Sequence, residues 1–226
     1  MMLADKTSHP EPAYARPAPG RYTAELGIKR SRFIALAGHC TTEDEARDFI
    51  NTIRREYPDA RHHCSAFVVQ VDGAQPIERS SDDGEPAGTA GQPMLEVLKG
   101  WGSPEPLQDV VVVVVRYFGG VKLGTGGLVR AYQEATREAL AETPLVLRRQ
   151  LDLYTCEVSH ADAGRVEAEV RSAGYTVVGV EYGGAAELSI ACEPGVTLPD
   201  FIASITSGEV EPHLVGQRWI EEKLGG

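Results

Sequence analysis

The sequence predicts an α+β protein with two domains, and three observations support this prediction. The chain has 226 residues, 42% of them hydrophobic, which is enough for one large core or two modest ones. Strand-like and helix-like patterns alternate along it, and their order changes after Arg149. The charge changes at the same place: residues 21–150 hold 16 basic and 18 acidic side chains, whereas residues 151–226 hold 4 and 13. We therefore expect a first domain over residues 21–149 and a second over residues 150–226.

The net charge of −11 excludes a uniformly basic nucleic-acid-binding protein. A local basic site in the nearly neutral first domain remains compatible with it. The strongly acidic second domain would repel phosphate and could attract a basic partner.

The first twenty residues contain four prolines among small and polar residues, which predicts a disordered leader over residues 1–20. No basic region followed by an apolar segment opens the chain, and the longest purely apolar run, Val110 to Val115, is too short to span a bilayer. We expect a cytoplasmic protein without a membrane partner. The four cysteines are scattered, with no Cys-x-x-Cys pair, and are expected to be free buried thiols.

In the first domain the six consecutive valines favour a strand that is covered on both faces, because β-branched side chains pack well there and lose χ1 freedom in a helix. We expect this run to be the central strand. Thr42 stands three residues before Glu45, which is the spacing of a helix-capping box. Together the patterns predict strands at residues 30–40, 62–71 and 110–115, and helices at residues 42–57, 94–98 and 128–139.

The second domain has the element order βαββαβ, which is typical of a ferredoxin-like fold of about 75 residues. Gly174 is expected to end its first helix, and Pro199 to begin its second. The patterns predict strands at residues 151–159, 175–182, 186–192 and 213–220, and helices at residues 162–173 and 199–205.

A glycine-rich segment, "RYFGGVKLGTGGLVRAY", follows the valine strand and leads into a helix. This arrangement favours anion binding, because backbone N–H groups point outward and the helix dipole attracts negative charge. We name residues 118–127 the glycine loop. The candidate binding residues in and beside it are Arg116, Tyr117, Phe118, Gly119, Gly120, Lys122, Gly124, Gly126, Gly127 and Arg130.

Two interpretations of this segment stay open. In one, the three basic side chains meet phosphate, and Tyr117 or Phe118 stacks on a base or a ring. In the other, the glycines only supply positive φ and close packing, and both aromatic side chains lie in the core. The segment matches neither a Walker loop nor a dinucleotide-binding fingerprint.

A second segment, "SDDGEPAGTAGQPML", places Asp82, Asp83, Gly84 and Glu85 in what we name the acidic turn, residues 82–85. Its carboxylates could hold a hard cation, but the EF-hand pattern is absent and we rank a metal last. They could form local turns, with Thr89 capping the next helix. They could also pair with Arg116, Lys122 or Arg130 and fix the glycine loop.

No catalytic pattern stands out in the sequence. "HHC" at residues 62–64 would place His62 and Cys64 on one face of a strand and His63 on the other, and no further ligands occur at zinc spacing. Neither a nucleophile elbow nor a triad is recognisable. We expect a binding protein rather than an enzyme, with no cofactor and no metal.

The segments "RSSDDGEPAGTAGQPML" and "VVVVRYFGGVKLGTGGLVRAY" together resemble the signature segments of the IMPACT family, and the two-domain layout resembles its bacterial YigZ-type members. The resemblance covers residues 21 to about 148 by motif and the second domain by layout. One stretch departs from the family pattern. Before the second strand the family usually has Ala-Thr-His-Asn-Cys-Trp-Ala-Tyr, whereas this chain has "ARHHCSAF", with Ser65 and Phe67 at the two aromatic positions.

The resemblance implies a ribosomal-protein domain-2-like, left-handed β-α-β fold for the first domain, shared with the fourth domain of elongation factor G. For the second domain it implies the fold of that factor's last domain. Eukaryotic relatives restrain a kinase that phosphorylates a translation initiation factor, by competing for the activator of that kinase. The implied role is regulation in translation, with the ribosome, RNA or a translation factor as partner. Two alternatives remain: an enzyme or binder of a small phosphate or nucleotide, and a protein adaptor that acts through its acidic second domain.

Overall fold

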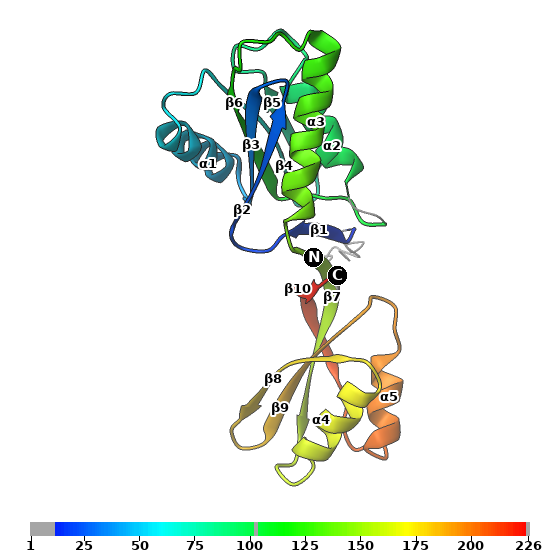
Figure 1. Ribbon diagram of the computed structural model, residues 1–226. Helices are drawn as coiled ribbons and strands as arrows, with labels where there is room; N and C mark the ends of the chain where they lie inside the picture. The colour runs from blue at the N-terminus through cyan, green and yellow to red at the C-terminus, as the bar shows by residue number, and fades with distance from the viewer. Residues whose placement is uncertain (1–11, 102–103, 225–226) are drawn as a thin grey trace. The chain divides into compact units, whose positions relative to one another are not determined.

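The computed structural model describes residues 12–101 and 104–224, and the chain divides into two compact units (Figure 1). One contains residues 13–148 together with the end of the chain from Glu221, and the other contains residues 149–220. Both units combine helices with a β-sheet, as the α+β prediction requires.

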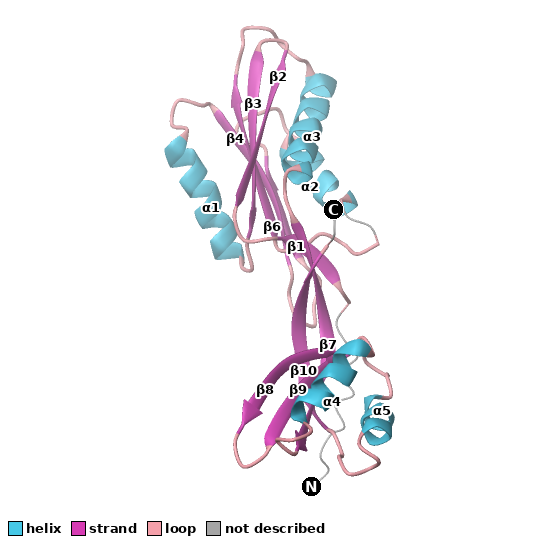
Figure 2. Ribbon diagram, turned by 60° about the horizontal axis from the view of Figure 1, so that its bottom comes forward, coloured by secondary structure: helices cyan, strands magenta, loops and turns pink. Residues whose placement is uncertain are grey.

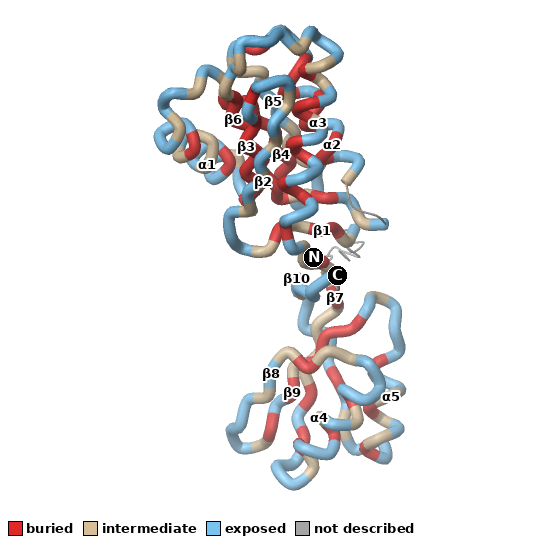
Figure 3. The backbone as a smooth tube through the Cα atoms, viewed as in Figure 1, coloured by how far each residue is buried: buried red, intermediate tan, exposed pale blue. Residues whose placement is uncertain are grey.

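The first unit is built on a five-stranded sheet in the order β2-β3-β6-β4-β5. Its neighbouring strands all pair antiparallel. The predicted valine strand lies at the centre, and the side chains of all six valines are fully buried, which confirms that prediction (Figure 3). The strands are β2 (Arg21–Ile28), β3 (Ser31–His39), β4 (His62–Val69), β5 (Ile77–Ser81) and β6 (Val110–Tyr117).

Helices cover both faces of this sheet, which explains why the valine run needs no polar face (Figures 1 and 2). Helix α1 (Glu43–Glu56) packs on one face, where Ile53 belongs to the same buried cluster as Val113 and Val115. Helices α2 (Gly91–Gly100) and α3 (Thr125–Ala141) cover the other face. Strands β3 and β4 both run antiparallel to β6, so β3, α1 and β4 form a β-α-β unit with β6 between its two strands.

The predicted capping box begins α1: the Thr42 side chain accepts a hydrogen bond from the Glu45 backbone N–H at 3.1 Å. The Glu45 carboxylate reaches back to the backbone N–H of Thr41 at 2.7 Å. The helix ends at Glu56, two residues before Pro58, because the residue that precedes a proline disfavours the helical conformation.

The expected leader is wrong for its last part. Residues Tyr14–Pro17 form strand β1, which pairs with the start of β7 (Leu145–Val158). The Tyr14 side chain is buried, and its hydroxyl donates to Asp109 at 2.8 Å, which ties this segment to the first unit. Residues 1–11 lie outside the described residues. Strands β2 and β5 were also not predicted.

The second unit has the predicted βαββαβ order, and its sheet order is β10-β7-β9-β8. Two helices pack against this sheet around a core that includes Val166, Leu188 and Ile202. Besides β7, its elements are α4 (Ala163–Ser172), β8 (Thr176–Tyr182), β9 (Ala186–Cys192), α5 (Leu198–Ile205) and β10 (His213–Lys223).

Two further predictions bear on the chemistry of the chain. All four cysteines are buried and free, as expected. Across residues 12–101 and 104–224, no helix combines the length and the apolar character that crossing a bilayer requires.

Candidate functional site

The acidic turn follows β5, and Asp82 organises the start of α2. The Asp82 carboxylate accepts hydrogen bonds from the backbone N–H groups of Gly88 at 2.8 Å, Ala90 at 3.0 Å and Gly91 at 2.8 Å. Burial alone would raise the pKa of Asp82, but these three donors together lower it below its usual value. The expected Thr89 cap is wrong: the N-cap residue is Ala90, and the Thr89 hydroxyl donates to the Pro86 carbonyl at 2.7 Å. The Asp82 carboxylate takes the place of the cap by accepting from the N–H groups of Ala90 and Gly91.

Asp83 ties the turn to β4 and to α1. One carboxylate oxygen accepts from the backbone N–H of His63 at 2.7 Å, and the other accepts from Arg54 at 2.7 Å. The Asp83 carbonyl accepts from Nδ1 of His62 at 2.9 Å. Asp83 has φ +40° and Gly84 has φ +84°, so two successive left-handed residues make this tight turn.

Glu85 reaches into the interior and joins three elements. Its Oε1 accepts from Nη1 of Arg116, at the end of β6, at 2.6 Å, and from the Tyr132 hydroxyl, on α3, at 2.7 Å. The side chains of Glu85 and Arg116 are only 4% and 7% exposed. The pairing of a turn carboxylate with Arg116, one of the alternatives left open by the sequence, is therefore present in the structure.

The guanidinium of Arg116 is fixed on several sides. Its carbon lies 5.5 Å from the Phe33 ring centroid and 5.6 Å from that of Phe118, and its Nη2 lies 3.5 Å from the Ser31 hydroxyl. Arg116 was predicted to meet phosphate, but its ion pair with Glu85 makes it a brace between the acidic turn and the central strand.

All three carboxylates of the acidic turn thus bind protein donors, which opposes the metal alternative. Among the residues that the structure describes, no three His, Cys, Asp or Glu side chains are grouped as metal ligands would be. The Cys64 thiol lies 3.0 Å from the Asp82 carbonyl, and burial raises the pKa of this thiol to about 12. At neutral pH such a thiol is protonated, which disfavours Cys64 as a nucleophile.

Three glycines of the glycine loop are required by the backbone. A Cβ on Gly119 would lie 1.9 Å from the carbonyl oxygen of Arg30, and Gly120 and Gly124 have φ +83° and +75°. Gly126 differs, because a Cβ built there meets nothing within 4 Å and its backbone is helical. The packing interpretation therefore explains Gly119, Gly120 and Gly124 and leaves Gly126 unexplained.

Helix α3 begins within the last part of this loop, at Thr125, and its N-terminus is open. Its N-cap is Gly124, which offers no side chain to the first N–H groups, and its first turn contains no acidic residue. The positive end of the helix dipole therefore faces outward uncompensated.

A pocket of about 400 Å³ joins the acidic turn to the start of α3, and we name it the loop pocket. Arg61 and Lys122 are exposed beside it, and the Phe118 side chain is 51% exposed. Arg61 was not predicted; its position directly before β4 was the only signal in the sequence. The lining residues are Arg61, His62, Glu85, Pro86, Arg116, Phe118, Lys122, Leu123, Gly124, Thr125 and Leu128.

The other predicted residues lie outside the lining of this pocket. Tyr117 packs in the cluster on the α1 face, with the Arg32 guanidinium 5.8 Å from its ring centroid. Arg130 is exposed on α3, and its Nε donates to the Gly126 carbonyl at 3.2 Å. The sequence left open whether the turn carboxylates pair with Arg116, Lys122 or Arg130, and the structure shows the pair with Arg116. Among the described residues, no carboxylate forms an ion pair with Lys122 or Arg130.

Comparison with known proteins covers both units. The model of the Impact N-terminal domain matches residues 29–140, and that of a domain of unknown function, DUF1949, matches residues 156–209. The chain is 36% identical over 187 residues to the IMPACT family member YvyE of Bacillus subtilis, covering 82% of this chain and 83% of the relative. It is 38% identical over 178 residues to the IMPACT family member YigZ of Escherichia coli, covering 79% and 85%.

A solved structure described as a crystal structure of a hypothetical protein is 34% identical to this chain. It covers 90% of this chain and 97% of its own, with a TM-score of 0.56. The similarity therefore extends over both units.

Proposed function

The chain belongs to the IMPACT family, and from this premise we propose that it is a regulatory protein of translation that binds the ribosome through phosphate groups of its RNA. The binding site is the loop pocket with the adjoining start of α3. The observation that carries this proposal is the open N-terminus of α3, which lies beside two exposed cations and one exposed aromatic ring.

The open helix end supplies the first part of the site. Because Gly124 has no side chain, the first N–H groups of α3 are available to the oxygens of a ligand. The 17-residue helix has no acidic residue in its first turn that would cancel the dipole. A phosphate at this end gains both hydrogen bonds and a favourable field.

The charges of the pocket supply the second part. Glu85 is the one acidic residue in the lining, and its ion pair with Arg116 compensates its charge. Arg61 and Lys122 then make the remaining charge positive. This explains how an acidic chain can hold a local site for phosphate.

Phe118 supplies the third part. Its ring is half exposed, and the Arg116 guanidinium below it holds it in place. An exposed aromatic side chain beside cationic groups is the arrangement on which an unpaired RNA base stacks. Phe118 thus adds affinity that does not depend on salt.

The alternative is a binder of a small phosphate or nucleotide, and the volume of the loop pocket favours it. About 400 Å³ falls within the roughly 300–1,000 Å³ that is usual for small-ligand sites. Catalysis has less support, because His62 and Glu85, the titratable acid–base candidates in the lining, are both engaged by protein partners.

Co-sedimentation of the protein with ribosomes over a salt series tests the proposal. Wild type should sediment at low salt and lose binding steeply as salt rises, because phosphate contacts release counterions. Lys122→Glu should abolish sedimentation. Arg137→Glu makes the same change in charge at an exposed position further along α3 and should keep it. Equal sedimentation of wild type and Lys122→Glu, or none by wild type at any salt, would reject the ribosomal site.

A further inference from the structure

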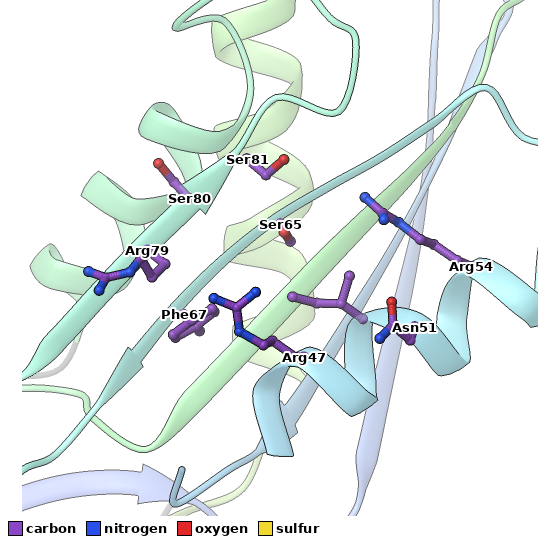
Figure 4. A pocket seen from close by; sticks show the side chains of 9 residues that line it. Arg47, Asn51, Arg54, Ser65, Phe67, Arg79, Ser80 and Ser81 are labelled. Carbon is purple, nitrogen blue, oxygen red and sulfur yellow. The ribbon is translucent and has the colours of Figure 1, made fainter. Parts of the chain in front are cut away.

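A second pocket of about 310 Å³ lies between α1 and the strands β4 and β5 (Figure 4). We name it the arginine pocket. Three arginines and three serines contribute to its lining, and the lining contains no acidic residue. The lining residues are Arg47, Ile50, Asn51, Arg54, Ser65, Phe67, Arg79, Ser80 and Ser81.

The helix contributes one continuous face to this pocket. Residues 47, 50, 51 and 54 follow the i, i+3, i+4, i+7 spacing, so their side chains project on the same side of α1. Figure 4 shows Arg47, Asn51 and Arg54 extending from the helix toward the strands.

Strands β4 and β5 contribute residues that pair with each other across the sheet. Ser65 pairs with Ser81, and Phe67 with Arg79, in the antiparallel ladder of β4 and β5. Paired residues share a face of a sheet, and residues two apart on one strand share it as well, so these four side chains face α1 together. Ser65 itself is a buried residue that lines the pocket.

Acidic residues orient the arginines from outside the lining. Glu43 accepts from Arg47 at 2.5 Å and lies 3.8 Å from Nε of Arg79, and Asp83 accepts from Arg54 at 2.7 Å. Three cations thus face two carboxylates, which leaves an excess of positive charge. The arginine side chains remain 43% to 61% exposed, so their other N–H groups can reach a ligand.

We propose that the arginine pocket binds the phosphate group of a small phosphate monoester, independently of the loop pocket. A phosphate monoester presents three charged oxygens, and the guanidinium groups approach from α1 and from β5. Forked guanidinium donors suit such a group better than lysines would, and serine hydroxyls can complete its hydrogen bonds. A carboxylate has only two oxygens and would leave part of this donor set unused.

The size of the pocket favours a small molecule over an internal phosphodiester of RNA. Its volume of about 310 Å³ lies at the low end of the roughly 300–1,000 Å³ that is usual for small-ligand sites. Helix α1 lies on one side of it and strand β5 on the other (Figure 4). The experiment therefore tests a phosphate monoester and an RNA phosphodiester as separate ligands.

Isothermal titration of the full chain with AMP, with inorganic phosphate and with adenosine tests this proposal. AMP and phosphate should bind and adenosine should not. Arg47→Gln and Arg79→Gln should each weaken AMP binding about tenfold or more, because each removes a charged donor. Both side chains are more than half exposed, so neither change should unfold the protein.

One matched variant serves as a control. Arg55→Gln removes the same charge from the same helix at an exposed position outside the pocket lining, and it should leave AMP binding unchanged. Loss of AMP binding in Lys122→Gln with none in Arg79→Gln would place the nucleotide in the loop pocket and overturn the proposal.

Several results would overturn the proposal. They are the absence of AMP and phosphate binding to wild type, equal binding of adenosine, and equal losses in Arg55→Gln and Arg79→Gln. Binding of an RNA oligonucleotide without a terminal phosphate that is lost in Arg79→Gln would also overturn it, in favour of a phosphodiester site.

Discussion

Glu85 accepts a hydrogen bond from Arg116 at 2.6 Å in a place where both side chains are almost completely buried. The contact joins the acidic turn to the end of the central strand, and the Tyr132 hydroxyl bonds to the same carboxylate oxygen. The acidic turn and the segment that contains Arg116 and the glycine loop are therefore connected in the folded protein. Residues of both segments line the loop pocket.

Removing the Glu85 carboxylate should destabilise the protein strongly. Glu85→Ala leaves the Arg116 charge buried without its partner, and we expect a loss of about 3–5 kcal/mol in the free energy of unfolding. Chemical denaturation measures this loss. Glu78→Ala, which breaks the exposed pair with Lys99, is the matched control and should cost less than about 1 kcal/mol. Adding Arg116→Leu to Glu85→Ala should recover part of the loss, and equal effects of Glu85→Ala and Glu78→Ala would contradict the role of the buried pair.

Asp82 should make stability depend on pH in the acidic range. Its pKa in the folded protein is lowered, since the three backbone donors outweigh the effect of burial, so the charged carboxylate stabilises the fold. This stabilisation is present above the unfolded pKa of about 3.9 and is lost as the pH falls through the folded value.

Asp82→Asn should therefore lower the unfolding free energy by about 1–3 kcal/mol at neutral pH, because an amide accepts these N–H groups less well. The difference from wild type should shrink as the pH is lowered below about 4. Denaturation curves over a pH series measure this difference, and a difference that grows toward low pH would contradict the assignment.

Two glycines of the same loop should respond oppositely to alanine. Gly119→Ala places a Cβ 1.9 Å from the backbone oxygen of Arg30, so the chain must shift, and we expect a loss of about 1–3 kcal/mol or more in stability. Gly126→Ala has free space in the first turn of α3 and should be neutral or stabilising by up to about 1 kcal/mol. Melting temperatures of the two variants test this, and equal destabilisation would show that the packing at Gly119 is not the cause.

The sequence was most informative where a pattern is local. Six valines, a capping box and a βαββαβ order each predict structure from neighbouring residues, and each is present in the structure. Strand β1 could not be found in this way, because its partner lies more than 120 residues further along the chain and its prolines resemble a leader. The short edge strand β5 was missed for a different reason: its sequence, Ile-Glu-Arg-Ser-Ser, is mostly polar and shows no apolar alternation.

The same distinction between local and long-range features applies to the candidate site. The glycine loop and acidic turn are continuous segments, so their chemistry could be recognised. Which side chain faces solvent depended on packing that only the fold supplies: Tyr117 turned toward the α1 face, Arg116 inward and Phe118 outward. The arginine pocket draws on three separate segments, and only the pairing of β4 with β5 brings Arg79 opposite α1.

The proposed RNA contact makes Phe118 and Lys122 separable by their dependence on salt. Phe118→Ala removes a stacking surface and should cost about 1–3 kcal/mol of binding to a single-stranded RNA, with the slope of log affinity against log salt unchanged. Lys122→Gln removes one phosphate contact and should reduce that slope by roughly one. Tyr182→Ala removes another exposed aromatic side chain, in the second unit, and should change neither quantity. Filter-binding titrations at four salt concentrations measure both effects. A changed slope in Phe118→Ala, or an unchanged one in Lys122→Gln, would mean that the loop pocket does not divide its binding between a stacked base and a phosphate.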